Sequence, residues 1–145
     1  MAKHVLITGA SQGIGAAAAR VFAREGWKVA VNYHSSREEA QALVRELCGL
    51  GGRAVPIQAD VSDPGQVEAL VREAEAALGP LDAVVCNAGV ALPQQLLTDT
   101  TGEQWRSLMA VDLDGMFYTL RAVIPGMVRR QRGAIVTVSS MWGVT

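Results

Sequence analysis

Residues 5–15 decide the fold, and they read Val5-Leu6-Ile7-Thr8-Gly9-Ala10-Ser11-Gln12-Gly13-Ile14-Gly15. The apolar start predicts a buried strand, the glycines predict a tight turn, and the alanine-rich segment that follows predicts a helix. Such a turn aims unpaired backbone N–H groups and the positive end of a helix dipole at one point. The stretch therefore predicts a site for a phosphate group.

Each glycine of this turn has its own expected role. Gly9 is expected to take a positive φ where the strand leaves the sheet. Gly13 has no Cβ, so a diphosphate can approach the backbone, and Gly15 lets the helix lie close on the strand. The spacing is Gly-x-x-x-Gly-x-Gly and not the Gly-x-Gly-x-x-Gly of the usual dinucleotide fingerprint. A glycine-rich turn without a ligand is the alternative, and the flanking strand and helix argue against it.

The composition indicates a single domain with a substantial core. Half of the 145 residues are apolar, and 13 basic against 14 acidic residues give a net charge of −1. This balance argues against a nucleic-acid footprint, which needs a basic surplus. No apolar run approaches the roughly 20 residues of a membrane-spanning helix, and the N-terminus runs straight into a strand, so no signal peptide is expected. Cys48 and Cys86 form no CxxC-type cluster, so we expect reduced thiols in a cytoplasmic protein and no metal site.

Apolar strands alternate with amphipathic helices along the chain. The expected strands are His4–Thr8, Lys28–Asn32, Ala54–Gln58, Leu81–Cys86 and Ala134–Val138. Strands that are apolar almost throughout, joined by helical crossovers, predict a parallel sheet covered on both faces, in a Rossmann-like doubly wound α/β fold. Right-handed crossovers, and Pro56 as a sign of an edge strand, favour the strand order 3-2-1-4-5.

Two of the expected helices have recognisable starts. Ser36 and Glu39 predict a capping box at the start of the second helix. Asp63 and Pro64 predict the N-cap and the first turn of the third helix. Helical periodicity returns at Trp105 after a loop-like stretch over residues 90–100 and continues to about residue 132.

Several motifs, at matching places along the chain, resemble the short-chain dehydrogenase/reductase family. They are Thr8–Gly15, Asp60-Val61, Asn87-Ala88-Gly89 and Ser139-Ser140-Met141-Trp142-Gly143. The likeness covers essentially all 145 residues but only the N-terminal part of the family's usual domain. It therefore implies an incomplete NAD(P)-binding Rossmann domain over residues 1–145, truncated before the last strands, with the fifth strand left as a bare apolar sheet edge.

The end of the second strand distinguishes between cofactors. An NAD site usually places an acidic residue there for the ribose 2′-hydroxyl, but residues 32–37 contain no carboxylate. Ser, Asn and Arg side chains would instead hydrogen-bond a 2′-phosphate, and the segment resembles the NADP-preferring members of the family. We therefore expect NADP rather than NAD. The alternatives are that Arg37 is merely an exposed first-turn residue and that Asp60 only shapes a turn.

Ligands of a doubly wound sheet bind beyond the carboxyl ends of its strands, and small or polar residues follow all the expected strands. With the resemblance, these positions give the expected cofactor-binding set. It consists of Gly9, Ser11, Gln12, Gly13, Ile14, Gly15, Asn32, Tyr33, His34, Ser36, Arg37, Asp60, Val61, Asn87, Ala88 and Gly89.

The resemblance assigns catalytic roles to Ser140 and Asp112. Ser140 matches the serine whose hydroxyl hydrogen-bonds the substrate carbonyl. Asp112 stands where the family usually has an asparagine, and a carboxylate cannot donate a hydrogen bond as an amide does. A role played by the main-chain carbonyl would tolerate this change, whereas a role of the amide would not. Met141 and Trp142 are expected to line the substrate cleft, with a place in the core as the alternative.

The family's proton donor and its helper, a Tyr-x-x-x-Lys pair, have no match in this sequence. Neither Tyr33 nor Tyr118 is followed by a lysine four residues later, and the only lysines are Lys3 and Lys28. The chemistry needs a phenol with a nearby ammonium group that lowers its pKa. We therefore expect this chain to bind a nucleotide without completing a reduction, as part of a longer reductase.

The resemblance implies hydride transfer from NADPH to a carbonyl group. The implied substrate is a 3-oxoacyl group on acyl carrier protein, as in fatty acid biosynthesis. The Ser-Met-Trp-Gly stretch is also similar to 5-aminopentanone reductases, which act on a modified lysine of elongation factor P. The expected helix over residues 113–131 matches one that the family uses in dimers and tetramers. A non-catalytic dinucleotide-binding module and an S-adenosylmethionine-binding, methyltransferase-like domain remain as alternatives, although the latter usually has an acidic residue after the second strand.

Overall fold

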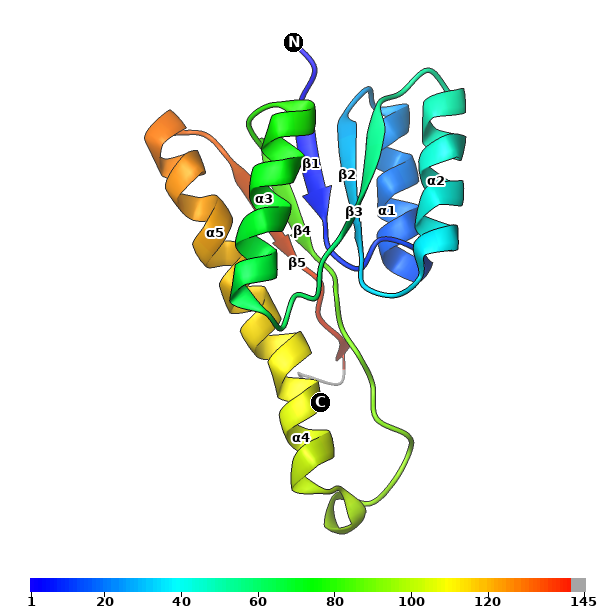
Figure 1. The fold of residues 1–145 in the computed structure, drawn as a ribbon, viewed down its shortest axis with the longest axis vertical. Coiled ribbons are helices and arrows are strands. Elements are labelled where there is room, and N and C mark those ends of the chain that lie inside the picture. Colours follow the sequence, from blue (N-terminus) through cyan, green and yellow to red (C-terminus); the bar gives the residue numbers. More distant parts are fainter. Residues whose placement is uncertain (142–145) are drawn as a thin grey trace.

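The computed structural model describes residues 1–141, and its centre is a five-stranded parallel sheet (Figure 1). The strand order is β3-β2-β1-β4-β5, as the sequence predicts. Trp142, expected at the substrate cleft, lies outside the described residues. The strands are β1 (His4–Ile7), β2 (Lys28–Tyr33), β3 (Ala54–Gln58), β4 (Ala83–Cys86) and β5 (Ala134–Thr137).

Helices cover both faces of the sheet (Figure 1). α1 and α2 lie on one face and α3 and α5 on the other, while α4 extends past the end of the sheet at which the strand arrows point. The helices are α1 (Gly13–Arg24), α2 (Arg37–Gly49), α3 (Pro64–Leu78), the 3-10 turn η1 (Leu97–Asp99), α4 (Gly102–Met109), the π-helical turn η2 (Ala110–Asp114) and α5 (Gly115–Arg130). Within residues 1–141, none of them combines the length and the apolar character of a membrane span.

The central strand β1 supplies side chains to two separate hydrophobic layers. Val5 and Ile7 pack with residues of α1 and α2, whereas Leu6 packs with residues of α3 and α5. All three side chains are fully buried, because β1 lies between β2 and β4 and successive side chains point to opposite faces. Burying each such side chain contributes about 1.5–3 kcal/mol. Because a shift of one residue would turn these side chains to the wrong faces, their burial also fixes where β1 ends and the following turn begins.

The predicted helix starts are partly confirmed. The Asp63 side chain caps α3 by accepting hydrogen bonds from the N–H groups of Gly65 and Gln66. The capping box of Ser36 with Glu39 is wrong: Ser36 is the N-cap residue of α2, but its side chain makes no capping hydrogen bond. Ser36 has a φ of −83° and a ψ of 65°, outside the extended conformation in which an N-cap side chain usually reaches the first turn, and it lines the cleft at the carboxyl ends of the strands.

A carboxylate at the start of β4 joins three segments of the chain. Asp82 accepts hydrogen bonds from the backbone N–H of His4 (2.9 Å) and from Nε of Arg132 (3.0 Å), just beyond α5. Burial alone would raise the pKa of this carboxyl, but the hydrogen bonds and the charge of Arg132 hold it below its usual value. Because the folded pKa is depressed, the charged carboxylate stabilises the fold above pH 4 or so, and this contribution is lost as the pH falls through the depressed pKa.

β5 is an edge strand whose four residues are all exposed, as the sequence predicts. Its ladder with β4 continues one step further, since the N–H of Val138 donates to the carbonyl of Cys86 (3.0 Å). Ile135 and Val136 are 42% and 50% exposed.

The two cysteines are free thiols in different surroundings. Cys48 is exposed near the end of α2, and Cys86 is buried in β4. Burial raises the pKa of the Cys86 thiol to about 11, so it stays protonated and unreactive at neutral pH. Within residues 1–141, no three His, Cys, Asp or Glu side chains come together as ligands for a metal ion.

Candidate dinucleotide-binding site

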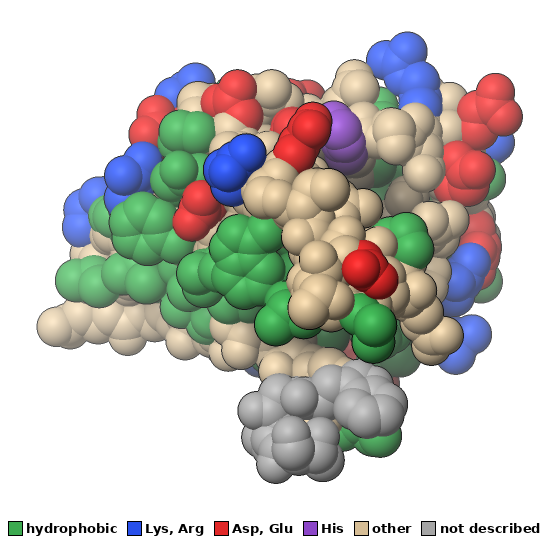
Figure 2. Space-filling view, turned by 90° about the horizontal axis from the view of Figure 1, so that it is seen from below, with side chains coloured by type: hydrophobic (Ala, Val, Ile, Leu, Met, Phe, Trp, Pro, Cys, Tyr) green, Lys and Arg blue, Asp and Glu red, His purple; other side chains and the backbone are tan. Residues whose placement is uncertain are grey.

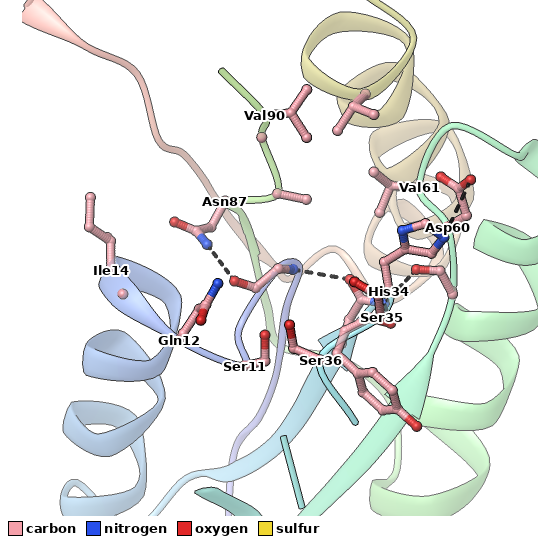
Figure 3. A pocket seen from close by; sticks show the side chains of 18 residues that line it. Ser11, Gln12, Ile14, His34, Ser35, Ser36, Asp60, Val61, Asn87 and Val90 are labelled. Carbon is pink, nitrogen blue, oxygen red and sulfur yellow. Dashed lines mark hydrogen bonds and ion pairs between the residues drawn. The ribbon is translucent and has the colours of Figure 1, made fainter. Parts of the chain in front are cut away.

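A cleft of about 570 Å³ lies at the carboxyl ends of the central strands. Figure 2 looks onto this end of the molecule and shows a strip of uncharged polar side chains and backbone over its middle, bordered by hydrophobic side chains on one side. Figure 3 shows the cleft from close by. The lining residues are Gly9, Ser11, Gln12, Gly13, Ile14, Asn32, Tyr33, His34, Ser35, Ser36, Ala59, Asp60, Val61, Asn87, Ala88, Gly89, Val90 and Val111.

The glycine-rich turn presents the N-terminus of α1 to this cleft. Gly13 has a φ of +59°, and a Cβ built on it would meet no atom within 4 Å. The N-cap residue Gln12 makes no side-chain capping bond, and the first turn of α1 contains no acidic residue. The first N–H groups of the helix are therefore left for a ligand, and the open space at Gly13 fits the approach of a diphosphate.

Two asparagines, which we call the asparagine clamp, hold this turn from its two sides. Oδ1 of Asn32 accepts a hydrogen bond from the N–H of Gly9 (3.0 Å), and Nδ2 of Asn87 donates to the carbonyls of Gly9 (2.9 Å) and Thr8 (3.1 Å). Figure 3 shows Asn87 reaching the turn from the β4 side. The clamp fixes the peptide group of Gly9 between the ends of β2 and β4.

The predicted role of Asn32 as a cofactor ligand is changed by its surroundings. Its side chain is buried, and Nδ2 lies within hydrogen-bonding distance (3.2–3.4 Å) of three backbone carbonyls at the ends of β2 and β3. With Oδ1 on Gly9, the amide is fully used inside the protein. Asn32 is therefore a positioning residue that ties the glycine turn to the neighbouring strand ends.

Thr8 is a site residue that the predicted set does not include. Its buried hydroxyl accepts hydrogen bonds from the N–H groups of Asn87 and Ala88 (3.0 Å each) and so joins the ends of β1 and β4. Gly15 does not line the cleft, but a Cβ there would lie 2.6 Å from Nδ2 of Asn87. Gly15 thus serves the close packing that the spacing predicts, and it supports the clamp.

Only some of the polar side chains in the turn after β2 line the cleft. His34, Ser35 and Ser36 line the cleft, but Arg37 does not. Nε of the exposed Arg37 donates to the hydroxyl of Tyr33 (3.3 Å), so this guanidinium is held outside the lining. The predicted role of Arg37 in cofactor binding stays a prediction, as does the alternative of an exposed first-turn residue.

Asp60, just beyond the end of β3, lies beside His34 on the same side of the cleft, as Figure 3 shows. Oδ2 of Asp60 lies 3.8 Å from Nε2 of His34, while Oδ1 accepts hydrogen bonds from the hydroxyl (2.7 Å) and the N–H (2.9 Å) of Ser62. The bond from the Ser62 hydroxyl, with that from its N–H and the charge of His34, outweighs burial and lowers the pKa of the Asp60 carboxyl. Asp60 therefore shapes its turn and also keeps a negative charge at the cleft.

Asp112 lies in η2, a π-helical turn of a kind often found near functional sites. Its Oδ1 accepts a hydrogen bond from the N–H of Val90 (2.8 Å), which fixes the segment that follows Asn87-Ala88-Gly89. Ser140 lies beyond the end of β5, and neither it nor Met141 lines the cleft. The observed role of the Asp112 side chain is that of an acceptor, which aspartate and asparagine can both fill.

An Asp112→Asn variant is therefore expected to keep this contact, whereas Asp112→Ala loses it. Removing the acceptor should cost about 1 kcal/mol of stability and speed hydrogen exchange at the Val90 amide by roughly fivefold, the same free energy expressed as a rate. Hydrogen exchange followed by NMR, with thermal unfolding, measures both effects. An asparagine variant as impaired as the alanine variant would show that the negative charge is what matters.

The cleft collects the predicted cofactor-binding set except Gly15 and Arg37. Four of its lining residues were not predicted: Ser35, Ala59, Val90 and Val111. Each is the sequence neighbour of a predicted site residue, so the strand-end motifs mark the right segments. Ala59, Val90 and Val111 have apolar side chains without a chemical signal of their own, whereas Ser35 belongs to the polar segment that follows β2.

Comparisons with known proteins agree with this geometry. The family model for short chain dehydrogenase matches residues 3–145. The chain belongs to the short-chain dehydrogenase family. Among curated short-chain dehydrogenases, the 3-oxoacyl-[acyl-carrier-protein] reductase FabG of Staphylococcus aureus strain Mu50 is 39% identical over 99% of this chain and 58% of its own length. The chain thus spans less than two thirds of this relative.

Two solved structures that contain a nicotinamide dinucleotide share the fold of this chain. A 3-oxoacyl-[acyl-carrier protein] reductase from Brucella melitensis with bound NAD has a TM-score of 0.91 and 38% identity, over 99% of this chain and 55% of that one. A blue fluorescent protein from a metagenomic library, in complex with NADPH, has a TM-score of 0.85 and 36% identity, over 96% of this chain and 56% of that one. These two structural neighbours therefore contain different dinucleotides, NAD and NADPH.

Proposed function

We propose that residues 1–145 are the dinucleotide-binding part of a short-chain dehydrogenase that reduces a carbonyl group with NADPH. The observation that carries the proposal is the uncapped N-terminus of α1, which the asparagine clamp holds at the mouth of the cleft. We further propose, from the FabG relative, that the whole protein acts on a 3-oxoacyl group bound to acyl carrier protein in fatty acid biosynthesis.

The lining residues fit the parts of a dinucleotide. The backbone around Gly13 would hold the diphosphate, and Asp60 and Val61 would lie at the adenine end of the cofactor. Residues 87–90 would lie alongside the bound dinucleotide. The bound cofactor would supply a hydride at its nicotinamide ring. Ser140, beyond the end of β5, would hydrogen-bond the substrate carbonyl.

NADP is proposed over NAD because of the residues at the end of β2. The lining residues that directly follow β2 are His34, Ser35 and Ser36, and none of them is acidic. Serine hydroxyls and a protonated imidazole donate hydrogen bonds to phosphate oxygens. Asp60 is the acidic residue of the lining, and it lies at the end of β3.

This chain is proposed to bind the dinucleotide without turning it over. Proton donation in the family depends on a Tyr-x-x-x-Lys pair, and these 145 residues contain none. The whole protein is proposed to be a cytoplasmic dimer or tetramer, a proposal supported by the free thiols and by the exposed apolar side chains of Trp105, Leu113 and Phe117 along α4, η2 and α5.

Calorimetric titration of the purified chain with NADPH, NADH and S-adenosylmethionine tests the proposal, together with an assay of NADPH oxidation on a 3-oxoacyl thioester. The expected result is NADPH binding tighter than NADH binding, with no binding of S-adenosylmethionine and no turnover. Preferred binding of S-adenosylmethionine would support a methyltransferase-like domain and contradict the proposal. Robust NADPH oxidation would contradict the expectation that the chain lacks its proton donor.

A further inference from the structure

A second cavity, of about 420 Å³, lies at the opposite end of the sheet from the dinucleotide cleft. Its walls come from the ends of α1 and α2, the start of β2 and the residues that lead into β3, at the end where the strand arrows of Figure 1 begin. Three of its described lining residues are cations, Arg24, Lys28 and Arg53, and none of them is acidic. We call this cavity the basic pocket.

The protein itself makes little use of these cations. Within residues 1–141, the side chains of Arg24 and Lys28 form no ion pair. Nη2 of Arg53 donates to the carbonyl of Ala77 (2.6 Å). That bond orients the guanidinium group and leaves most of its five N–H donors for another acceptor.

The helix ends that border the basic pocket do not neutralise it. A helix C-terminus carries about −0.5 of a charge, so α1 and α2 together offset about one of the three positive charges. Their last carbonyls already accept hydrogen bonds from the backbone. The N–H groups of Gly26 and Trp27 donate to carbonyls of α1 (3.0 Å each), and those of Gly51 and Gly52 donate to carbonyls of α2 (3.0 and 3.3 Å).

Neighbouring carboxylates leave the positive surplus in place. Glu46, which the charge of Arg24 reaches, is bound through both oxygens by Arg20 (2.8 Å each). Glu25 follows Arg24 in the chain, but it is exposed and lies outside the lining. The basic pocket is therefore a concave surface whose cations lack an anionic partner of their own.

Trp27 gives the basic pocket a fixed wall. Its ring packs edge-on against Phe22, with 5.0 Å between the ring centroids, and Nζ of Lys3 lies 5.3 Å from the centroid of the indole. Lys3 thus places a further positive charge beside the pocket. A Cβ on Gly26 or Gly51 would meet no atom within 4 Å, so the two loops leave the cavity open to a ligand.

We propose that the basic pocket binds a small molecule that carries a phosphate group, at a site separate from the dinucleotide cleft. A phosphate group carries about 1.5–2 negative charges and three acceptor oxygens, and guanidinium groups bind it through paired hydrogen bonds. Small-molecule sites typically have volumes of about 300–1,000 Å³, a range that includes this cavity. The proposal does not depend on what the dinucleotide cleft binds.

Titration of the chain with inorganic pyrophosphate, followed by two-dimensional NMR of the backbone amides at low ionic strength, tests this proposal. Sodium chloride at matched ionic strength is the reference. We expect saturable shifts at residues 26–28 and 51–53, with a Kd on the order of 1 mM, because exposed charge pairs are individually weak. Shifts at residues 9–15 report separately on the dinucleotide cleft, so the two sites are distinguished in one experiment.

The double variant Arg24→Gln with Arg53→Gln should raise the Kd at the basic pocket about tenfold or more, and Arg24→Gln alone about threefold. The control is Arg45→Gln with Arg72→Gln, which removes the same charge from exposed positions outside the pocket and should leave this Kd unchanged.

Three results would overturn the proposal. The first is a set of pyrophosphate shifts confined to residues 9–15, and the second is equal shifts at the basic pocket in sodium chloride. The third is equal weakening by the two double variants, which would show that only the overall charge of the chain matters.

Discussion

Replacing Gly13 with alanine is expected to weaken NADPH binding about 100-fold or more. The Cβ would meet no protein atom within 4 Å, so the folded chain has room for it. The methyl group would instead stand in the open space beside the first turn of α1, where the diphosphate has to approach the backbone N–H groups. Losing that approach removes charge-assisted hydrogen bonds worth about 1.5–3 kcal/mol each.

Gly26→Ala is the matched control for this prediction. Gly26 follows α1 at the end remote from the cleft, has a φ of +79° and, like Gly13, would place a Cβ in open space. Both substitutions force alanine into the left-handed region at a cost of about 1–2 kcal/mol, so the two variants should unfold at similar denaturant concentrations. Calorimetric titration should then show lost binding only in Gly13→Ala. Unchanged NADPH affinity in Gly13→Ala would show that the cofactor does not bind at the glycine turn.

Asn87→Asp is expected to have the second large effect, on folding and binding together. The substitution keeps the shape of the side chain but replaces the Nδ2 donor with an acceptor, which would face the carbonyl oxygens of Thr8 and Gly9. Leaving these acceptors unsatisfied beside a carboxylate should lower the free energy of unfolding by about 2–4 kcal/mol. With the glycine turn released, NADPH binding should become undetectable.

The control for Asn87→Asp is Gln95→Glu, which also converts an amide into a carboxylate. Gln95 is exposed and lies outside the cleft lining, and its Nε2 donates to the side chains of Thr100 and Gln104, which are half-buried. Denaturant unfolding and NADPH titration of both variants measure the contrast, and Gln95→Glu should behave as the unmodified protein does. An Asn87→Asp variant with normal stability would mean that the clamp does not hold the turn.

Much of the fold can be predicted from the sequence because the local sequence patterns favour the same strands and helices that the packing of the sheet requires. The apolar run at Val5–Ile7, the glycine turn and the helical periodicity of the crossovers each demand the same βα arrangement, and Pro56 places β3 at an edge. The strand-end motifs identify the cleft for a similar reason: parallel strands bring their carboxyl ends to one edge of the sheet.

The sequence does not predict which of two possible sets of contacts a polar side chain makes in the folded protein. Ser36 looks like a helix cap, but it lines the cleft. Arg37 is predicted as a phosphate ligand, and in this structure its Nε donates to the hydroxyl of Tyr33. Asn32 looks like a ligand and is consumed by internal hydrogen bonds. In each case the residue type is suited to both roles, and only the three-dimensional placement decides between them.

The π-helical turn that carries Asp112 is a further feature without a local signature. Residues 110–114 continue the apolar periodicity of the helices on either side, so the pattern reads as one helix. The wider π-helical turn is seen only in the structure, in which the Asp112 side chain accepts a hydrogen bond from the N–H of Val90. The substitution of aspartate for the family's asparagine is compatible with this contact, since both side chains offer an oxygen acceptor.

A crystal structure of the chain grown with saturating NADPH tests the central claim most directly. The account predicts the diphosphate at the N-terminus of α1, with its oxygens within hydrogen-bonding distance of the backbone N–H groups around Gly13, and the asparagine clamp unchanged. An ordered dinucleotide bound elsewhere on the molecule, with the glycine turn making no contact to phosphate, would contradict it.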